Sequence, residues 1–398
     1  MITFVIPSHN NLQHLKNVYA SILKHASSAE IILLDDGSTD STWEWIWQLA
    51  ESHQHREVKA YKSKERVGHT ILYDVGIKMS TNQIVGILHA DMIIGPNYVE
   101  NMIKHLKPGK VVCATRVEPP LHPAGKEKII KDFGMDFDSL NLVAFDQFVE
   151  RQQKEDIDKT TRGMFAPWIL YKTDFVSIGG HDPLFEPFPL EDSDIFQRWV
   201  LNGYELIQSR DALVYHLTCR GHRWTGEVGK DDEYFKLANA KASKNYLRKW
   251  GSWIRNDEFH HPILPPVYDI GYRIKNSNYK LIELLEPWCS TIAVDGEWAA
   301  VKEYIIREQS QTNFDLEKRF KPYGNLHLLQ NDIVVEFDGN QLTQNSFNIL
   351  QNLSYIIQDS GATGTFELDV FKITINRINE RSSELVDVNN PSYQRRLI

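Results

Sequence analysis

Residues 84–91 read Ile84-Val85-Gly86-Ile87-Leu88-His89-Ala90-Asp91, and this stretch decides the fold class. Its first five residues are apolar and partly β-branched, which is typical of a short strand buried on both faces of a parallel sheet. His89 and Asp91 follow where such a strand ends, and ligands of open α/β sheets bind at the carboxyl ends of their strands. The stretch therefore predicts a buried parallel strand that leads into a binding edge.

The polar residues at this strand end are suited to a divalent cation. Asp91 offers a hard carboxylate oxygen and His89 an imidazole nitrogen, and a spacing of two residues lets both reach one ion. The alternative is a polar strand end without a ligand. On the tripeptide alone that alternative is the more frequent arrangement, so the rest of the chain has to decide between them.

Strands and helices alternate on both sides of this stretch. Further strands are predicted over residues 2–6, 30–34, 58–61 and 111–115, with amphipathic helical segments between them. Such alternation implies right-handed crossovers and a doubly wound, mostly parallel α/β sheet. Residues 117–162 are charged and irregular, and we expect helices and loops that flank a cleft. A later strand is predicted over residues 165–171, followed by helices over residues 191–201 and 231–250.

A proline-rich segment divides the chain. Residues 260–266 read His-His-Pro-Ile-Leu-Pro-Pro, which cannot continue a helix and is typical of a linker. We therefore predict a first domain over residues 1–255, a linker over 256–268 and a smaller C-terminal α+β domain over 269–398. The last domain has a predicted strand at 332–337, a helix at 343–358 and one or two strands within 365–378.

Composition excludes several classes of protein. The chain has 398 residues, 42% of them hydrophobic and 24% charged, which describes an ordinary globular protein. The formal net charge of −9 disfavours a nucleic-acid binder, which needs a basic surface. The three isolated cysteines form neither a zinc pattern nor a disulfide framework. With no recognisable signal peptide or transmembrane stretch, a cytoplasmic location is expected.

An acidic turn follows the second predicted strand. Residues 35–40 read Asp-Asp-Gly-Ser-Thr-Asp, and a carboxylate there can accept the imide N–H of uracil or the equivalent edge of another base. Gly37 allows a close backbone approach. An acidic turn with serine and threonine is also a good helix N-cap, and the two interpretations are evenly matched.

Several motifs, in order, resemble those of family 2 glycosyltransferases. They are Val5-Ile6-Pro7-Ser8-His9-Asn10, residues 30–40, His89-Ala90-Asp91, Gly179-Gly180-His181-Asp182 and Leu190-Glu191-Asp192-Ser193-Asp194. The resemblance covers roughly residues 1–225. It implies the nucleotide-sugar-binding α/β fold called GT-A, a divalent metal, and transfer that inverts the anomeric centre.

The resemblance assigns donor-binding roles. Asp36 is expected to contact the base of a UDP- or GDP-sugar, and Pro7, Ser8 and His9 to line its pocket. His89 and Asp91 occupy the family's Asp-x-Asp position, where Mn²⁺ or Mg²⁺ would bridge the two phosphates. The expected metal ligands are His89, Asp91 and His216, although the His at position 89 departs from the family's acid and a His after a strand is often structural.

The acidic pair Glu191-Asp192 matches the family's catalytic pair. Inversion needs one carboxylate to take the proton from the acceptor hydroxyl. Adjacent residues on a helix project about 100° apart, so only one of the two is expected to face the acceptor. We assign Asp192 as the base, with Glu191 or Asp194 orienting the acceptor. Acids that merely complement the helix dipole, worth about 0.3–1 kcal/mol, are the alternative.

Two further stretches are compared with the family. Arg223-Trp224 resembles the end of the Gln-x-x-Arg-Trp element, so these residues are expected to touch the diphosphate and the acceptor. Leu72-Tyr73-Asp74 stands where the family often has Ala-Arg-Asn, and Arg66 is the alternative source of the missing positive charge. Phe185 and Phe188, in a proline-rich loop, are candidates for stacking on a sugar ring.

The predicted function is metal-dependent, inverting transfer of a sugar from a nucleoside diphosphate donor to a glycan, lipid or protein acceptor. A sugar nucleotidyltransferase and a non-catalytic nucleotide-sugar-binding scaffold on the same fold are the alternatives. The departures at His89 and Tyr73 motivate the scaffold. No motif assigns the C-terminal domain, which could bind the acceptor, form a homo-oligomer or recruit a partner enzyme.

Overall fold

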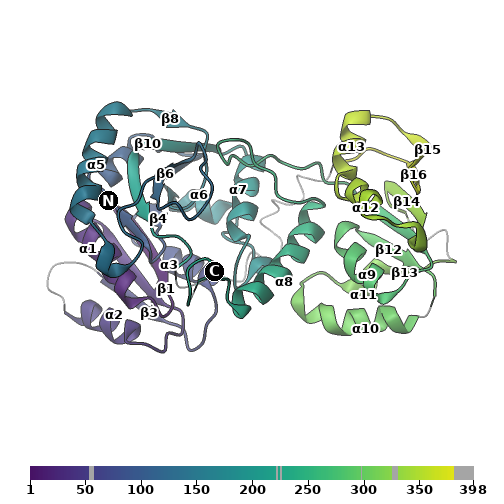
Figure 1. Ribbon diagram of the computed structural model, residues 1–398, viewed down its shortest axis with the longest axis horizontal. Coiled ribbons are helices and arrows are strands. Elements are labelled where there is room, and N and C mark those ends of the chain that lie inside the picture. The colour runs from purple at the N-terminus through teal and green to yellow at the C-terminus, as the bar shows by residue number, and fades with distance from the viewer. Residues whose placement is uncertain (53–57, 221–222, 225, 297, 325–329, 381–398) are drawn as a thin grey trace. The chain divides into compact units, whose positions relative to one another are not determined.

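The computed structural model describes residues 1–52, 58–220, 223–224, 226–296, 298–324 and 330–380. Within this range the chain forms two compact units, one of residues 1–239 and 256–263 and one of residues 240–255 and 264–380. Each unit has its own apolar core and its own sheet (Figure 1).

The first unit is built on a ten-stranded sheet. Its strands are β1 (Ile2–Ser8), β2 (Glu30–Asp35), β3 (Val58–Lys62), β4 (Ile84–Ile87), β5 (Met92–Ile94), β6 (Lys110–Glu118), β7 (Lys128–Ile130), β8 (Thr160–Thr161), β9 (Trp168–Tyr171) and β10 (Glu205–His216). They follow the order β3-β2-β1-β4-β9-β6-β10-β5, with β7 beside β6 and β8 beside β10. The pairs among β1 to β4 are parallel, as are β6 with β7 and β6 with β10, whereas β5, β8 and β9 run antiparallel to their neighbours.

Helices connect these strands. They are α1 (Leu12–His25), α2 (Thr42–Glu51), α3 (His69–Met79), α4 (Tyr98–Ile103), α5 (Leu142–Glu155), α6 (Lys172–Ser177) and α7 (Glu191–Leu201). Helix α1 buries Leu15, Val18 and Ile22, the apolar face that its 3.6-residue period predicts. Helix α3 packs closely on β1, because a Cβ at Gly76 would lie only 2.3 Å from Cγ1 of Val5. This close approach brings the start of α3 to the edge of the sheet where β1 ends.

The predicted α/β sheet is confirmed. The five strands predicted in the first third of the chain are β1, β2, β3, β4 and β6, and the parallel connections are as expected. The predicted strand at 165–171 is present as the shorter β9, but it runs antiparallel between β4 and β6. The sequence did not predict β5, a three-residue strand that begins directly after Asp91 and proves decisive for the site.

The second unit has a six-stranded sheet in the order β13-β12-β11-β14-β16-β15. Its strands are β11 (Ile270–Lys275), β12 (Thr291–Val294), β13 (Phe320–Pro322), β14 (Ile333–Asp338), β15 (Gly364–Leu368) and β16 (Phe371–Ile375), and its helices are α9 (Tyr279–Leu285), α10 (Trp298–Glu308), α11 (Leu316–Arg319), α12 (Gln344–Gln351) and α13 (Leu353–Ser360). The first four strands of that order are parallel and the last two antiparallel. The single helix predicted over 343–358 is two helices that meet at Asn352, whose side-chain amide donates to the carbonyl of Asn348 and competes with the helical pattern.

The division of the chain differs from the predicted boundary. The observed boundary lies within helix α8 (Glu233–Trp250), because residues 240–255 group with the second unit. The reason is Arg248, a buried guanidinium that bonds Glu286 and Glu308. Residues 256–263, expected in the linker, group instead with the first unit, where Asp257 pairs with Arg162 at 2.7 Å.

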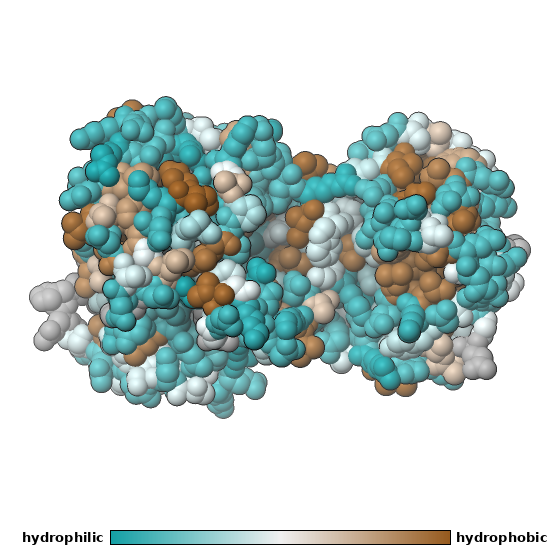
Figure 2. Space-filling model, viewed as in Figure 1, coloured by the Kyte–Doolittle hydropathy of each residue, from teal (hydrophilic) through white to brown (hydrophobic). Residues whose placement is uncertain are grey.

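Hydrophilic residues cover most of the face drawn in Figure 2, with apolar residues in local patches on both units. This agrees with the ordinary charged fraction of the sequence, 24%. Among the helices that the structure describes, none combines the length and the apolar character needed to cross a membrane.

Candidate functional site

Polar residues gather where the parallel strands of the first unit end. β1 ends at Ser8, β2 at Asp35, β6 at Glu118 and β10 at His216, while β4 leads into His89. Because parallel strands present their carboxyl ends at one edge of a sheet, residues from distant parts of the chain meet there. This edge contains the residues predicted from the sequence.

Strand register explains how three of them meet. β5 pairs antiparallel with β10, with Met92 opposite His216, so the preceding Asp91 lies beside that histidine. β10 also pairs with β6, with Tyr215 opposite Val117, which brings Glu118 to the other side of His216. Nε2 of His216 lies 3.7 Å from Oδ1 of Asp91, and Nδ1 lies 2.9 Å from Oε1 of Glu118.

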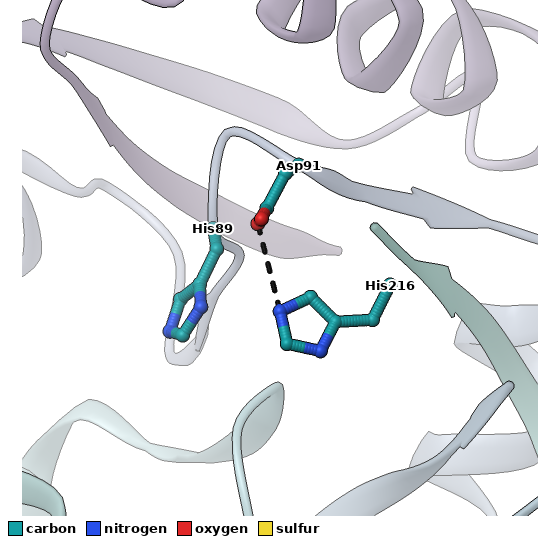
Figure 3. Close-up of side chains that lie close together, drawn as sticks. All are labelled: His89, Asp91 and His216. Carbon is teal, nitrogen blue, oxygen red and sulfur yellow. Dashed lines mark ion pairs between the residues drawn. The ribbon is translucent and has the colours of Figure 1, made fainter. Parts of the chain in front are cut away.

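The ligand atoms of His89, Asp91 and His216 all lie within 4.8 Å of one another. The Asp91 carboxylate points toward the ring of His216, and the ring of His89 lies on the other side of it (Figure 3). Asp91 is buried, and its other oxygen accepts a hydrogen bond from the backbone N–H of Arg220 at 3.0 Å. The buried Nε2 of His216 has no hydrogen-bond partner among the described residues. A carboxylate with two imidazoles, one of them unsatisfied, is a donor set that fits Mn²⁺.

Glu118 orients His216. The Nδ1–H of His216 donates to Glu118, which leaves the lone pair of Nε2 on the side of Asp91. Arg116 and Lys128 contact the same carboxylate at 2.8 and 2.9 Å. Burial favours its protonated form, but the hydrogen bond from His216 and the charge of Arg116 prevail and hold the pKa of Glu118 well below its usual range. Glu118 was not predicted from the sequence, although its place at the end of β6 is the kind of signal that identified His216.

Five of the residues to which the sequence assigned a donor role, Pro7, Ser8, His9, Asp36 and His89, line one pocket. Pro7, Ser8, His9 and Asp36 line this β1 pocket, together with Asn11, Arg66, His69, Tyr73, His89, Ala90, Phe188 and Arg220. The Nδ1–H of His9 donates to the carbonyl of Asp36 at 2.7 Å. The Asp36 carboxylate itself accepts the backbone N–H groups of Val67 and Gly68, at 2.6 and 3.1 Å, and so ties the end of β2 to the start of α3.

Two arginines supply the positive charge of the β1 pocket. The guanidinium of Arg66 lies 4.4 Å from the ring centre of Tyr234 and 5.3 Å from that of Phe188. The sequence suggested Arg66 as the source of the positive charge that is missing at Tyr73, whereas it did not predict Arg220 in this pocket. Tyr73, which stands where the family has arginine, is a wall residue of the same pocket.

Arg223 and Trp224 lie outside the β1 pocket. Both side chains bond Asp231, Arg223 from Nε at 2.6 Å and Trp224 from Nε1 at 3.1 Å. Trp224 also stacks on His122 with 5.4 Å between ring centres. Trp224 nevertheless lines a neighbouring cavity together with His9, Arg66 and Arg220, and Arg223 lines the cavity at the start of α7. Their neighbours Gly221 and His222 lie outside the described residues.

A larger cavity, of about 650 Å³, opens at the start of α7. We call it the α7 cleft; its lining includes His69, His89, Arg116, Glu118, His122, Phe165, Glu191, Asp192, His216, Arg223 and Phe235. Helix α7 is held by Arg198, whose buried guanidinium bonds Asp194 at 2.7 Å and the carbonyls of Ile178 and Gly180. Asp194 is fully buried in this ion pair and does not face the cleft.

The two acids at the start of α7 differ in their surroundings. Glu191 is buried, and its Oε1 lies 2.7 Å from Nε2 of His69. Oδ1 of Asp192 is buried without a hydrogen-bond partner in the described part of the chain. Burial, and secondly the charge of Glu191, raise the pKa of Asp192 to about 7. A carboxyl with this pKa is suited to proton transfer at neutral pH.

Neither of the two aromatic residues expected to stack on a sugar ring, Phe185 and Phe188, is well exposed. Phe185 is completely buried in the fold, so the prediction for it is wrong. Phe188 also has little exposed surface, because its ring is stacked between His69 and Phe235. Sequence alone does not distinguish such core positions from exposed ones in a proline-rich loop.

The N-terminal part of the chain is similar to known proteins. Residues 3–165 match the sequence profile of glycosyl transferase family 2. An uncharacterized glycosyltransferase of Nostoc sp. is 26% identical over 112 residues, which are 28% of this chain and 34% of that protein. A dolichol-phosphate mannosyltransferase of Pyrococcus furiosus is 24% identical over 114 residues, or 28% of this chain and 32% of that protein. The chain thus spans about a third of the length of these curated relatives.

Solved structures with similar folds include GalNAc-T7 with UDP, GalNAc and Mn²⁺. That comparison has a TM-score of 0.46 at 15% identity, and covers 78% of this chain and 54% of the other. A mannosyltransferase from Pyrobaculum calidifontis, in complex with GDP-Man and Mn²⁺, has a TM-score of 0.41 at 17% identity over 62% of each chain.

Proposed function

We propose that this chain, whose residues 3–165 match the sequence profile of glycosyl transferase family 2, transfers a sugar from a nucleoside diphosphate donor to an acceptor hydroxyl. One observation carries the proposal. The β1 pocket and the α7 cleft share His69 and His89, and the His89–Asp91–His216 group stands at this junction. A donor in the first cavity and an acceptor in the second would meet beside the metal ligands.

The donor is a UDP- or GDP-sugar. Pro7, Ser8, His9 and Asp36 would surround the base, and the β1-pocket arginines would attract the diphosphate. A divalent cation, Mn²⁺ or Mg²⁺, held by the His89–Asp91–His216 group would neutralise negative charge on the leaving diphosphate.

The transfer step assigns one task to Asp192. Its carboxylate takes the proton of the acceptor hydroxyl as the acceptor oxygen bonds the anomeric carbon. The bond from that carbon to the phosphate oxygen breaks, and its electron pair leaves with the nucleoside diphosphate. Attack opposite the leaving group inverts the anomeric centre. Glu191 lies beside the base and keeps its negative charge close to it.

The acceptor is a glycan, a lipid-linked sugar or a protein. A poly-beta-1,6-N-acetyl-D-glucosamine synthase of Staphylococcus epidermidis, 27% identical over 135 residues, makes polysaccharide synthesis a reasonable case to test. These residues are 33% of this chain and 32% of the synthase. The second unit would serve in acceptor binding or in self-association.

A donor screen tests the function. The full chain is incubated with UDP-glucose, UDP-N-acetylglucosamine and GDP-mannose, each with Mn²⁺, and release of the nucleoside diphosphate is measured. We expect slow hydrolysis of one donor without an acceptor, and its loss when EDTA removes the cation. No release from any donor would support a non-catalytic scaffold. Release of pyrophosphate from UTP or GTP with a sugar 1-phosphate would instead identify a nucleotidyltransferase.

A further inference from the structure

His69 lies where the β1 pocket and the α7 cleft meet, yet neither base recognition nor the cation site requires it. It is the first residue of α3 and lines both cavities. Its Nε2 is 2.7 Å from Oε1 of Glu191, 122 residues further along the chain. Side-chain exposure is only 20% for His69 and 5% for Glu191, so water does not screen this contact strongly.

The position of His69 is fixed from two sides. Its ring stacks on Phe188, with 5.2 Å between ring centres and 12° between planes. The backbone beside it is docked as well, because the Thr70 hydroxyl donates to the carbonyl of Pro187 at 2.8 Å. A Cβ at Gly68 would lie 2.3 Å from the same carbonyl oxygen, so only glycine allows this approach. The histidine is therefore held against the loop that leads into α7.

The contact makes the two neighbouring carboxylates unequal. His69 donates to Glu191, while Oδ1 of Asp192 has no hydrogen-bond partner in the range that the structure describes. Without His69, Glu191 and Asp192 would be two adjacent buried carboxylates whose negative charges repel each other. With it, Glu191 is anchored and Asp192 remains available to the α7 cleft.

The charges agree with this arrangement. Burial, the largest single influence, lowers the pKa of His69, but the charge and hydrogen bond of Glu191 together with the charges of Asp192 and Asp36 raise it overall. Burial alone would raise the pKa of Glu191, but the His69 charge and hydrogen bond lower it. Both shifts favour an imidazolium–carboxylate pair.

We propose that His69 is a positioning residue for sugar transfer, which anchors the Glu191 carboxylate through Nε2 and thereby leaves Asp192 placed to take the acceptor proton. The inference rests on the proposed function. It goes beyond it by assigning a task to His69, a residue that lines both cavities but has no role in the proposed donor, metal or base chemistry.

Two substitutions in the full chain separate the hydrogen bond from the ring. His69→Phe keeps the stack on Phe188 and removes the donor, whereas His69→Gln keeps an N–H near the place of Nε2. The readout is hydrolysis of the best donor of the screen with Mn²⁺. We expect His69→Phe to lower kcat about 10- to 100-fold with little change in the donor KM, as loss of an outer orienting partner does in metal sites. His69→Gln should recover most of the rate.

A double-mutant cycle with Glu191→Gln shows through which residue His69 acts. If it acts through Glu191, the double variant His69→Phe/Glu191→Gln will be little slower than Glu191→Gln alone. Additive effects would overturn the proposal. His25→Gln is the matched control, since His25 also lies beside a carboxylate, that of Asp146 at 3.2 Å, but on α1.

The other outcomes are equally decisive. A folded His69→Phe variant with wild-type kcat would overturn the proposal, and so would a His69→Gln variant as slow as the phenylalanine variant. If the phenylalanine variant does not fold, His69→Asn replaces it, because the shorter amide cannot reach Oε1 of Glu191. An inactive wild type would contradict the proposed function itself, whereas an active wild type with unaffected variants contradicts only this inference.

Discussion

Both sheets carry polar residues at the carboxyl ends of parallel strands, and in the described part of the second sheet several of these residues bond one another. After β11 and β14, the Asn276 amide donates to both oxygens of Asp338 at 2.9 Å. The backbone N–H of Ser277 donates to Asp295 at 3.1 Å. In the first unit, Nε2 of His216 and Oδ1 of Asp192 are buried and have no such partner among the described residues.

This difference indicates where a ligand is needed. A buried polar atom without a partner costs about 1–3 kcal/mol, so a folded chain retains few of them without a reason. The first edge concentrates several such atoms beside two cavities, whereas Asn276, Ser277, Asp295 and Asp338 at the described part of the second edge bond one another. The parallel-strand topology alone would suggest a ligand at both sheet edges. The two edges differ in whether their polar side chains have hydrogen-bond partners within the protein.

The largest effect is expected from Asp192→Asn. The amide keeps the size of the side chain but cannot take the acceptor proton, so transfer should fall by about 10²- to 10⁴-fold. Affinity for the nucleoside diphosphate, measured by calorimetric titration, should be unchanged. Asp194→Asn would act differently, through lost stability, because Asp194 pairs with Arg198. Normal transfer by Asp192→Asn would move the base to Glu191.

The next effect is expected from Asp91→Ala. It removes the charged member of the His89–Asp91–His216 group, so turnover should fall by about 10²- to 10³-fold, as when a principal electrostatic stabiliser is lost. Circular dichroism should show an intact fold, because Asp91 stands at a strand end. Asp138→Ala, an exposed acid of the same unit, is the control. Near wild-type turnover at saturating donor would contradict the metal assignment.

How far the sequence predicts the site depends on how close together its parts lie along the chain. His89 and Asp91 could be found because one strand end carries both. Glu118 and His69 could not be paired with their partners, which lie 98 and 122 residues away and meet them only through strand register and helix docking. The boundary within α8 had the same cause, since a helical period does not reveal that Arg248 bonds Glu286.

A smaller effect is expected from Glu118→Gln, measured as Mn²⁺ affinity by electron paramagnetic resonance. The amide can donate as well as accept, so it no longer fixes the proton on Nδ1 of His216. Loss of such a partner typically weakens metal binding about 10- to 100-fold. Glu127→Gln is a matched control, because Glu127 is equally buried and lies near Arg116, at 3.7 Å, but does not bond His216. Equal effects of both variants would show a general electrostatic role instead.

The pH dependence of the transfer rate of the wild-type protein should report the ionisation of Asp192. Asp192 acts as a base only when ionised, and its pKa is raised to about 7. The transfer rate should therefore rise about tenfold per pH unit below pH 7 and level off above it. Burial and Glu191 raise this pKa, while His69 and Arg116 oppose them. A rate that is flat from pH 5 to pH 8 would exclude Asp192 as the titrating base.

The smallest effect on activity is expected from a change in the second unit, and it tests whether the two units differ in role as their strand ends suggest. Glu286 is completely buried and bonds Arg248, Arg319 and Tyr304. Glu286→Gln leaves those guanidinium groups partly uncompensated, which should destabilise the second unit by about 3–5 kcal/mol. Calorimetric unfolding should report this loss, while Glu283→Gln, half exposed and 3.7 Å from Lys244, should leave stability nearly unchanged. Donor hydrolysis at 25 °C should match that of the wild type, because the residues assigned to donor, cation and base belong to the first unit. A large fall in donor hydrolysis with the fold retained would show that the second unit takes part in the chemistry.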